Sequence, residues 1–232
     1  MERLDKIISK CMNISRSDAS KKIRSGEIEV DSETKKDPSE KFDENMSVFS
    51  SGGIVLSYNK FIYIMMNKPE GVISASEGKD ETTVIDILPE KIKRNGLFPA
   101  GRLDRNTTGF CLITDDGMFA HEILSPKRHV EKEYIFETDN PISKENLEKI
   151  RKGISTGGSV FRPCEINETG VRTYDIILKE GKYHEIKKMA HFAGAEVIKL
   201  KRIRIGSLFL DENLKPGDAR ILKREEVLKI RN

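Results

Sequence analysis

The sequence predicts an α+β protein, in which a small N-terminal module precedes a larger domain built around a mixed, largely antiparallel sheet. Two observations indicate this. Helical and strand-like patterns are interspersed along the larger domain without the regular strand–helix–strand rhythm of a parallel sheet. Serine and glycine at residues 50–53 and a polar segment at residues 57–60 form a linker. We therefore expect a module at residues 1–57 and a domain at residues 60–232.

The N-terminal module is expected to contain two helices and a β-hairpin. Apolar residues at helical spacing predict a helix over residues 3–12. Ser15 is placed to cap a second helix, which should end at Gly26. Alternation over residues 27–30 predicts a strand that pairs with residues 46–49.

The elements of the larger domain follow from the same patterns. Strands are expected at residues 62–66, 110–114, 134–138, 174–178 and 198–205. Helices are expected at residues 118–124, 144–152 and 185–193. Asp115 and Asp116, adjacent in a turn, are expected to cap the first of these helices.

Composition bounds the classes of function. The formal net charge is only +3, which does not by itself identify a nucleic-acid binder. Cys11, Cys111 and Cys164 are odd in number and far apart, so no disulfide framework or zinc pattern is indicated. No signal peptide and no apolar run of about 20 residues is visible. We expect a soluble, cytoplasmic protein with reduced cysteines, no membrane partner and a monomeric state.

Cofactor motifs are also missing from the sequence. It has no glycine-rich phosphate loop and no nucleotide-binding fingerprint, so we expect no nucleotide and no other cofactor. His184 and His191 could share a helix face, but no third ligand follows metal-site spacing, and no metal is expected. His121 and His129 are expected to be structural or to face RNA.

The most informative segment is the loop Gly-Arg-Leu-Asp-Arg-Asn-Thr-Thr-Gly at residues 101–109, which leads into an apolar strand. Asp104 lies between Arg102 and Arg105, and neighbouring cations favour the ionised form of a carboxylate. Loops on a rigid scaffold frequently hold catalytic groups. Taken alone, the loop is equally consistent with a capped turn held by an arginine–aspartate pair.

The pattern Gly-Arg-Leu-Asp-x-x-Thr-x-Gly before an apolar strand resembles the signature of the RsuA-type pseudouridine synthases. Four further segments resemble motifs of that family in the same order, at residues 67–71, 131–134, 181–189 and 200–227. The resemblance implies a cofactor-free isomerisation of uridine to pseudouridine in rRNA. It implies that Asp104 is catalytic, that Tyr134 stacks on the target uracil and that Lys187 pairs with Asp104.

Further site residues follow from this resemblance and from the chemistry. Ile186 is implied to pack against the base. Arg102 is a candidate to occupy the space that the base vacates, or to bind the flanking phosphate. Lys68 and Lys188 are expected to contact the substrate or RNA.

Residues 3–38 resemble the RNA-binding domain first seen in ribosomal protein S-four. The resemblance implies RNA contacts from one set of residues, namely Arg3, Lys6, Arg16, Ser17, Lys21, Lys22 and Arg24. The hairpin departs from the family, because Asp31-Ser32-Glu33 stands where Asn-Gly is usual. A two-residue primed turn is harder to form without glycine, so we expect a longer turn or a type I turn.

Three alternatives stay open. The first is a relative that acts on large-subunit (23S) rRNA. The segment Gly-Lys-Tyr-His-Glu-Ile-Lys-Lys-Met at residues 181–189 has Tyr-His and Lys where those relatives usually have Asn and Arg. This difference favours small-subunit (16S) rRNA as the substrate. A non-catalytic RNA-binding or ribosome-assembly protein could use the same two domains. A glycosidase-like hydrolase would need paired carboxylates about 5–10 Å apart.

Overall fold

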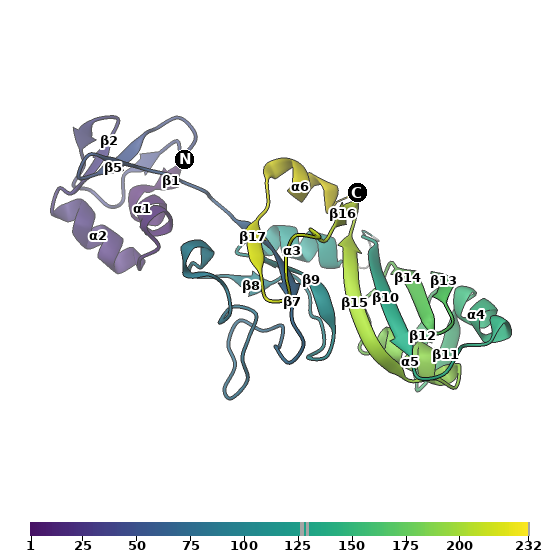
Figure 1. The fold of residues 1–232 in the computed structure, drawn as a ribbon. Coiled ribbons are helices and arrows are strands. Elements are labelled where there is room, and N and C mark those ends of the chain that lie inside the picture. The colour runs from purple at the N-terminus through teal and green to yellow at the C-terminus, as the bar shows by residue number, and fades with distance from the viewer. Residues whose placement is uncertain (126–127, 129, 232) are drawn as a thin grey trace. The chain divides into compact units, whose positions relative to one another are not determined.

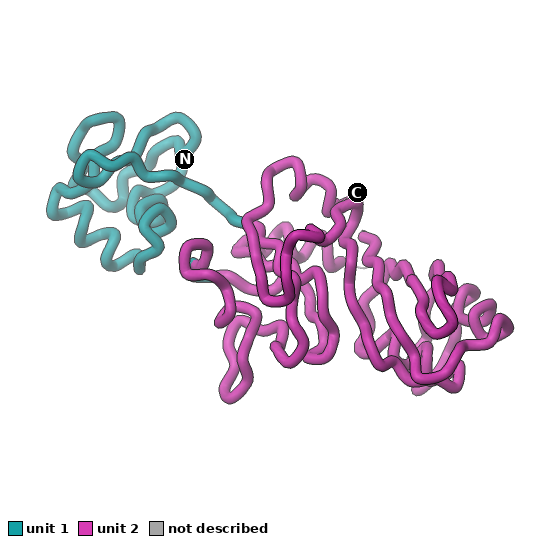
Figure 2. Tube along the Cα trace, in the orientation of Figure 1, with its two compact units in different colours: residues 1–62, 94–96 teal, residues 63–93, 97–232 magenta. Residues whose placement is uncertain are grey.

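The computed structural model describes residues 1–125, 128 and 130–231, so His129 lies outside the described residues. The chain divides into two compact units, residues 1–62 with 94–96 and residues 63–93 with 97–232 (Figure 2). Each unit has its own hydrophobic core. Among the described residues, no helix is both long enough and apolar enough to cross a membrane.

The first unit combines two helices with a four-stranded sheet, in the order β3-β2-β5-β6, and a two-stranded sheet of β1 and β4. The helices are α1 (Leu4–Met12) and α2 (Arg16–Arg24), and Ser15 caps the second by accepting a hydrogen bond from the Asp18 N–H at 3.1 Å. The strands are β1 (Glu2–Arg3), β2 (Ile28–Val30), β3 (Glu33–Thr34), β4 (Lys41–Phe42), β5 (Phe49–Ser51) and β6 (Ile54–Leu56). The two predicted helices are confirmed. The strand predicted at residues 27–30 does form an antiparallel pair, but its partner is Phe49–Ser51 and not residues 46–49, so only Phe49 of the predicted partner strand takes part.

The hairpin turn differs from the prediction. Val30 pairs with Glu33, so only Asp31 and Ser32 lie between the strands, and their φ angles are 52° and 70°. Two left-handed residues define the two-residue primed turn that we judged harder to form, so the prediction of a longer turn or a type I turn is wrong. The Asp31 carboxylate accepts a hydrogen bond from the Val48 N–H at 2.8 Å, which stabilises this conformation.

The second unit contains a nine-stranded sheet in the order β13-β14-β10-β15-β9-β7-β17, with β16 beside β15 and β8 beside β9 (Figure 1). Its strands are β7 (Tyr63–Lys68), β8 (Phe98–Pro99), β9 (Thr108–Thr114), β10 (Lys132–Thr138), β13 (Glu165–Gly170), β14 (Thr173–Leu178), β15 (Val197–Ile205), β16 (Leu208–Phe209) and β17 (Ala219–Ile221). Every pairing is antiparallel except that of β9 with β15. The predicted mixed, largely antiparallel sheet is confirmed.

Helices and a short hairpin complete this unit. They are the 3-10 turn η1 (Glu90–Ile92), α3 (Gly117–Leu124), α4 (Lys144–Arg151), α5 (Glu185–Phe192), α6 (Arg224–Lys229) and the hairpin β11 (Ile154–Thr156) with β12 (Ser159–Phe161). Asp116 caps α3 as predicted, because it accepts hydrogen bonds from the N–H groups of Met118 and Phe119 at 3.1 and 3.0 Å. The Tyr63 hydroxyl donates to the same carboxylate at 2.7 Å and joins α3 to β7.

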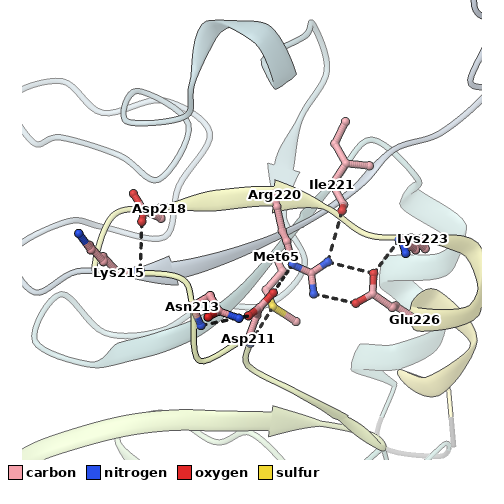
Figure 3. Close-up of polar contacts among 9 residues, drawn as sticks. All are labelled: Met65, Asp211, Asn213, Lys215, Asp218, Arg220, Ile221, Lys223 and Glu226. Atoms are coloured by element: carbon pink, nitrogen blue, oxygen red, sulfur yellow. Dashed lines mark hydrogen bonds and ion pairs between the residues drawn. The ribbon is translucent and has the colours of Figure 1, made fainter.

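The C-terminal segment is fastened to the sheet through Arg220 on β17 (Figure 3). The Arg220 guanidinium donates to Asp211 at 2.7 Å and to both carboxylate oxygens of Glu226 at 2.7 and 2.9 Å. This guanidinium lowers the pKa of Glu226, and together with the Asn213 N–H it lowers the pKa of Asp211. One arginine therefore holds β17, the loop before it and α6 together beside β7.

One row of residues crosses the centre of the sheet. Gly109 on β9 is paired with Lys68 on β7 on one side and with Arg202 on β15 on the other, and Arg202 is paired with Tyr134 on β10. Gly109 has φ +95°, and a Cβ there would lie 2.2 Å from the Arg202 carbonyl oxygen. The parallel pair therefore requires glycine at this position.

The turn before α5 is held by two glutamates with little exposure to solvent. Glu185 accepts a hydrogen bond from the Lys182 N–H at 2.9 Å. Glu180 accepts hydrogen bonds from the Arg162 N–H and from the Lys182 ammonium, both at 2.9 Å. Burial raises the pKa of Glu185 to about 7, and the neighbouring Glu180 carboxylate acts in the same direction. Folding therefore favours the protonated form of Glu185 at pH values below about 7.

Replacing Gly109 with alanine should destabilise the second unit. The Gly109→Ala variant combines an unfavourable φ with a backbone clash, and we expect a loss of more than about 2 kcal/mol in urea denaturation. Gly117→Ala is the matched control, because a Cβ at Gly117 meets nothing within 4 Å. Equal stability of the two variants would show that the β9–β15 pair tolerates a side chain.

The Glu185 carboxyl should make stability depend on pH. Because the folded state raises its pKa from 4.5 to about 7, the folded protein binds more protons, and stability falls as pH rises through this range. Between pH 5 and 8, Glu185→Gln should gain about 1–3 kcal/mol relative to the wild type. Thermal unfolding across this range measures the effect, with the exposed Glu168→Gln as control. Parallel pH profiles for Glu185→Gln and the wild type would contradict this assignment.

Candidate active site

The loop before β9 and the first turn of α5 bring Asp104 and Lys187 into contact. The Lys187 ammonium donates to Asp104 Oδ2 at 2.7 Å, and both side chains are about 30% exposed. His184 Nε2 lies 3.4 Å from the same oxygen. His184 immediately precedes α5, and residues three apart on a helix lie on the same side, so His184 and Lys187 both face the carboxylate.

Asp104, His184 and Lys187 line one cavity in the second unit. Its lining consists of Arg102, Leu103, Asp104, Thr107, Tyr134, Leu178, Gly181, Lys182, His184, Glu185, Ile186, Lys187 and Leu200. The cavity thus gathers five residues that we predicted for the site from distant parts of the sequence: Arg102, Asp104, Tyr134, Ile186 and Lys187. Tyr134 is only 9% exposed, and the Arg202 guanidinium carbon lies 6.0 Å from the centre of its ring.

The backbone on each side of Asp104 is clamped by the turn that follows β7. The Ser74 hydroxyl donates to the Leu103 carbonyl at 3.0 Å and accepts from the Leu103 N–H at 3.1 Å. The Gly71 N–H donates to the Arg105 carbonyl at 3.0 Å. These contacts position the Asp104 carboxylate before any substrate binds.

Lys68 does not lie where RNA could contact it. Its side chain is fully buried, and its ammonium donates to the carbonyls of Pro69, Arg105 and Thr107 at 3.0, 3.1 and 2.9 Å. Burial lowers the pKa of Lys68 to about 8. Because the side chain is buried and its ammonium has three carbonyl acceptors, Pro69 next to it and two in the loop, the expected contact of Lys68 with substrate or RNA is wrong in this structure. Lys68 instead stabilises the loop by donating hydrogen bonds to two of its backbone carbonyls.

Lys188 points away from Asp104. Its ammonium lies 3.4 Å from the Ser159 hydroxyl on β12 and 5.7 Å from the centre of the Tyr183 ring. Adjacent lysines on α5 therefore have different surroundings, with Lys187 at the carboxylate and Lys188 at the hairpin.

The residues expected to bind RNA in the N-terminal module all belong to the first unit, and most of the basic ones form ion pairs with acids of the same unit. Asp5 pairs with Arg3 at 2.9 Å and with Arg16 at 2.8 Å. Among the other expected residues, Lys6 pairs with Glu2, Lys21 with Asp18 at 3.0 Å, and Lys22 with Glu27 at 2.7 Å. Ser17 and Arg24 are exposed on α2.

Four residues around the site have roles that the sequence analysis missed. His184 contacts Asp104, Ser74 holds the loop, Lys68 supports it, and Arg202 donates to the Phe110 carbonyl at 2.7 Å beside Tyr134. The spacing of His184 three residues before Lys187 was the available signal for the first. Within the described part of the chain, no group of three or more His, Cys, Asp or Glu side chains could hold a metal ion.

The arrangement suits a planar ring bound next to an electrophilic carbon. Tyr134 and Ile186 provide an aromatic and an apolar wall. The Asp104 carboxylate, with a cation at 2.7 Å, provides an ionised group that can act as a nucleophile or a base. Asp116 caps a helix and does not line this cavity, so it forms no glycosidase pair with Asp104; the second carboxyl in the lining is Glu185, which accepts from the Lys182 N–H at 2.9 Å.

Comparison with known proteins agrees with this geometry. Residues 62–192 match the family described as RNA pseudouridylate synthase. An uncharacterized RNA pseudouridine synthase of Bacillus subtilis, YtzG, is 39% identical over 97% of this chain and 96% of its own length. Ribosomal small subunit pseudouridine synthase A of Escherichia coli is 33% identical over 98% of this chain and 99% of its own length.

A solved structure shares both the fold and the sequence pattern. The crystal structure of a pseudouridylate synthase superimposes with a TM-score of 0.69 at 31% identity, covering 99% of this chain and 100% of that one. The match extends over both units, and the family match covers the loop with Asp104, the strand with Tyr134 and the helix with Lys187. This chain therefore belongs to the RNA pseudouridylate synthase family, whose RsuA-type enzymes its motifs resemble.

Proposed function

We propose that this enzyme converts one uridine of small-subunit (16S) rRNA into pseudouridine. The observation that carries the proposal is the Asp104–Lys187 ion pair at 2.7 Å in a cavity that Tyr134 lines. The substrate is inferred from relatives that share almost the whole chain and are named ribosomal small subunit pseudouridine synthase A.

The isomerisation breaks the N1–C1′ glycosidic bond, turns the uracil and joins C5 to C1′. The C5 proton is lost and N1 gains a proton, so no oxidant, reductant or external group is consumed, and no cofactor is required. Asp104 acts at the ribose, either by attacking C1′ or by removing the C2′ proton. Both routes require an ionised carboxylate, which Lys187 stabilises and orients.

The uridine must leave its stack before C1′ and C5 can be reached. In our proposal the flipped uracil stacks on Tyr134 and packs against Ile186, two walls of the same cavity. The exposed Arg102 at the cavity occupies the space that the base vacates or binds the flanking phosphate. The Tyr134 hydroxyl is the candidate to help remove the C5 proton.

We propose further that residues 1–57 are an S-four-type RNA-binding domain and that residues 60–232 are the catalytic domain. The cations of α2, with Arg3, Lys6 and Ser17, would contact RNA phosphates and contribute affinity rather than chemistry. Lys188 would add a phosphate contact at the catalytic domain. The protein would act as a monomer in the cytoplasm, where its rRNA substrate is found.

The proposal is tested by mapping pseudouridines in rRNA from cells with and without the gene. One position in 16S rRNA should lose its modification and regain it when the wild-type gene is restored. A missing pseudouridine in 23S rRNA instead would assign the large-subunit substrate. An unchanged map of both RNAs would contradict synthase activity on rRNA.

Asp104→Asn should abolish the reaction while RNA affinity stays within a few-fold of the wild type. The substitution keeps the shape of the side chain and removes its charge, and in our proposal the carboxylate does not bind phosphate. We expect the single-turnover rate to fall at least about 1,000-fold. Near-normal turnover would show that the proposed mechanism is wrong, and loss of most of the binding would make Asp104 structural.

Lys187→Met and Lys188→Met should separate catalysis from binding. Losing one partner of a buried ion pair costs about 3–5 kcal/mol, and solvent screens part of this at about 30% exposure. We therefore expect Lys187→Met to slow single turnover at saturating RNA by about 10- to 100-fold, with partial recovery in Lys187→Arg. Lys188→Met should weaken RNA binding and leave the rate on bound RNA nearly intact. Equal losses of rate in both variants would contradict the assignment of Lys187.

A further inference from the structure

Tyr183 is a large aromatic side chain left open to solvent at the edge of the active site. It is 74% exposed. Its ring stacks on the His184 imidazole with centroids 3.8 Å apart and planes inclined by 19°. His184 in turn lies 3.4 Å from the Asp104 carboxylate. The two stacked rings therefore connect the Asp104 carboxylate with the solvent-exposed surface. The sequence motifs assigned no role to Tyr183.

The turn that presents these rings is held in place. His184 has a φ of +53°, a left-handed conformation that the surrounding contacts must stabilise. The Glu185 carboxyl accepts from the Lys182 N–H at 2.9 Å, and the Lys182 ammonium binds Glu180 at 2.9 Å. A ring fixed in this way loses little conformational entropy when a ligand stacks on it.

Positive charge lies close to the ring. The Lys188 ammonium is 5.7 Å from the centre of the Tyr183 ring. An aromatic face next to a basic side chain is the combination that binds unpaired nucleotides, because the ring stacks on the base and the cation contacts the phosphate.

Base flipping creates a need for such a surface. When the target uridine leaves its stack, the base next to it loses a stacking partner, and this loss is part of the energy that flipping costs. A ring just outside the catalytic carboxylate can replace that partner. Tyr183 is an exposed aromatic side chain whose ring stacks on His184, a residue that lines the cavity.

We propose that Tyr183, backed by His184, stacks on the unpaired base of a nucleotide that flanks the target uridine. The inference rests on the proposed function and adds to it a second base-binding position, distinct from the cavity wall at Tyr134. Tyr183 is thereby a residue for substrate recognition, and the RNA around the target uridine is single-stranded when bound.

The test measures RNA binding and single turnover with a 16S rRNA fragment that contains the mapped uridine. Tyr183→Ala should raise Kd by about 5- to 150-fold and leave the rate at saturating RNA nearly unchanged. Tyr183→Phe, which keeps the ring, should bind like the wild type. Phe209→Ala is the matched control, because Phe209 is an aromatic side chain of the same unit, 57% exposed, that does not line the cavity.

Abasic nucleotides identify the partner. An abasic nucleotide replaces, in turn, the nucleotide before and the nucleotide after the target uridine. One of these two substitutions should weaken wild-type binding by a similar factor and should add nothing to the loss in Tyr183→Ala. The inference is overturned if Tyr183→Ala binds like the wild type, or if both abasic substitutions weaken the variant as much as the wild type. It is also overturned if the main loss is in rate, since Tyr183 would then only hold His184 against Asp104.

Activity of the wild type separates this inference from the function on which it rests. A map in which no 16S rRNA uridine depends on the gene overturns the proposed function and this inference with it. An active wild type with an unaffected Tyr183→Ala variant overturns this inference alone.

Discussion

The parallel pairing of β9 with β15 at Gly109 and Arg202 is the constraint on which the candidate active site depends. It is the one parallel contact among the strand pairs of the described sheet, and it joins the strand that follows the Asp104 loop to the strands that hold Tyr134. Arg202 strengthens the junction by donating from Nε to the Phe110 carbonyl at 2.7 Å. Since Arg202 also pairs with Tyr134, the register of this contact sets the distance between the loop and the cavity wall.

The loop itself depends on a buried cation. Lys68 sits opposite Gly109 and donates to the carbonyls of Arg105 and Thr107, and the Arg105 carbonyl also accepts from the Gly71 N–H. Burial lowers the pKa of Lys68, and the charge of Asp104 acts in the opposite direction. Lys68 therefore holds the backbone of the loop, while Lys187 contacts the Asp104 carboxylate directly at 2.7 Å.

The elements that the sequence predicts well are those whose signals are local. The caps Ser15, Ser143 and Asp116 each accept a hydrogen bond from a backbone N–H two or three residues later, so a few neighbouring residues determine where their helices begin. Long buried strands such as β9 and β10 show clear hydrophobic patterns. The strands β11, β12 and β17 have three residues each, and β13 has six residues of which only Ile166 is buried. Segments so short or so exposed have no periodicity to detect.

The sequence by itself determined the family and the candidates Asp104, Tyr134 and Lys187, because these are properties of short motifs in a fixed order. Tertiary structure alone decided that Lys68 is buried, since its acceptors Arg105 and Thr107 lie 37 and 39 residues further along the chain. It also decided the primed turn at Asp31 and Ser32, where a hydrogen bond from Val48 offsets the missing glycine. In each case the deciding group is distant in sequence and near only after folding, so no local pattern could report it.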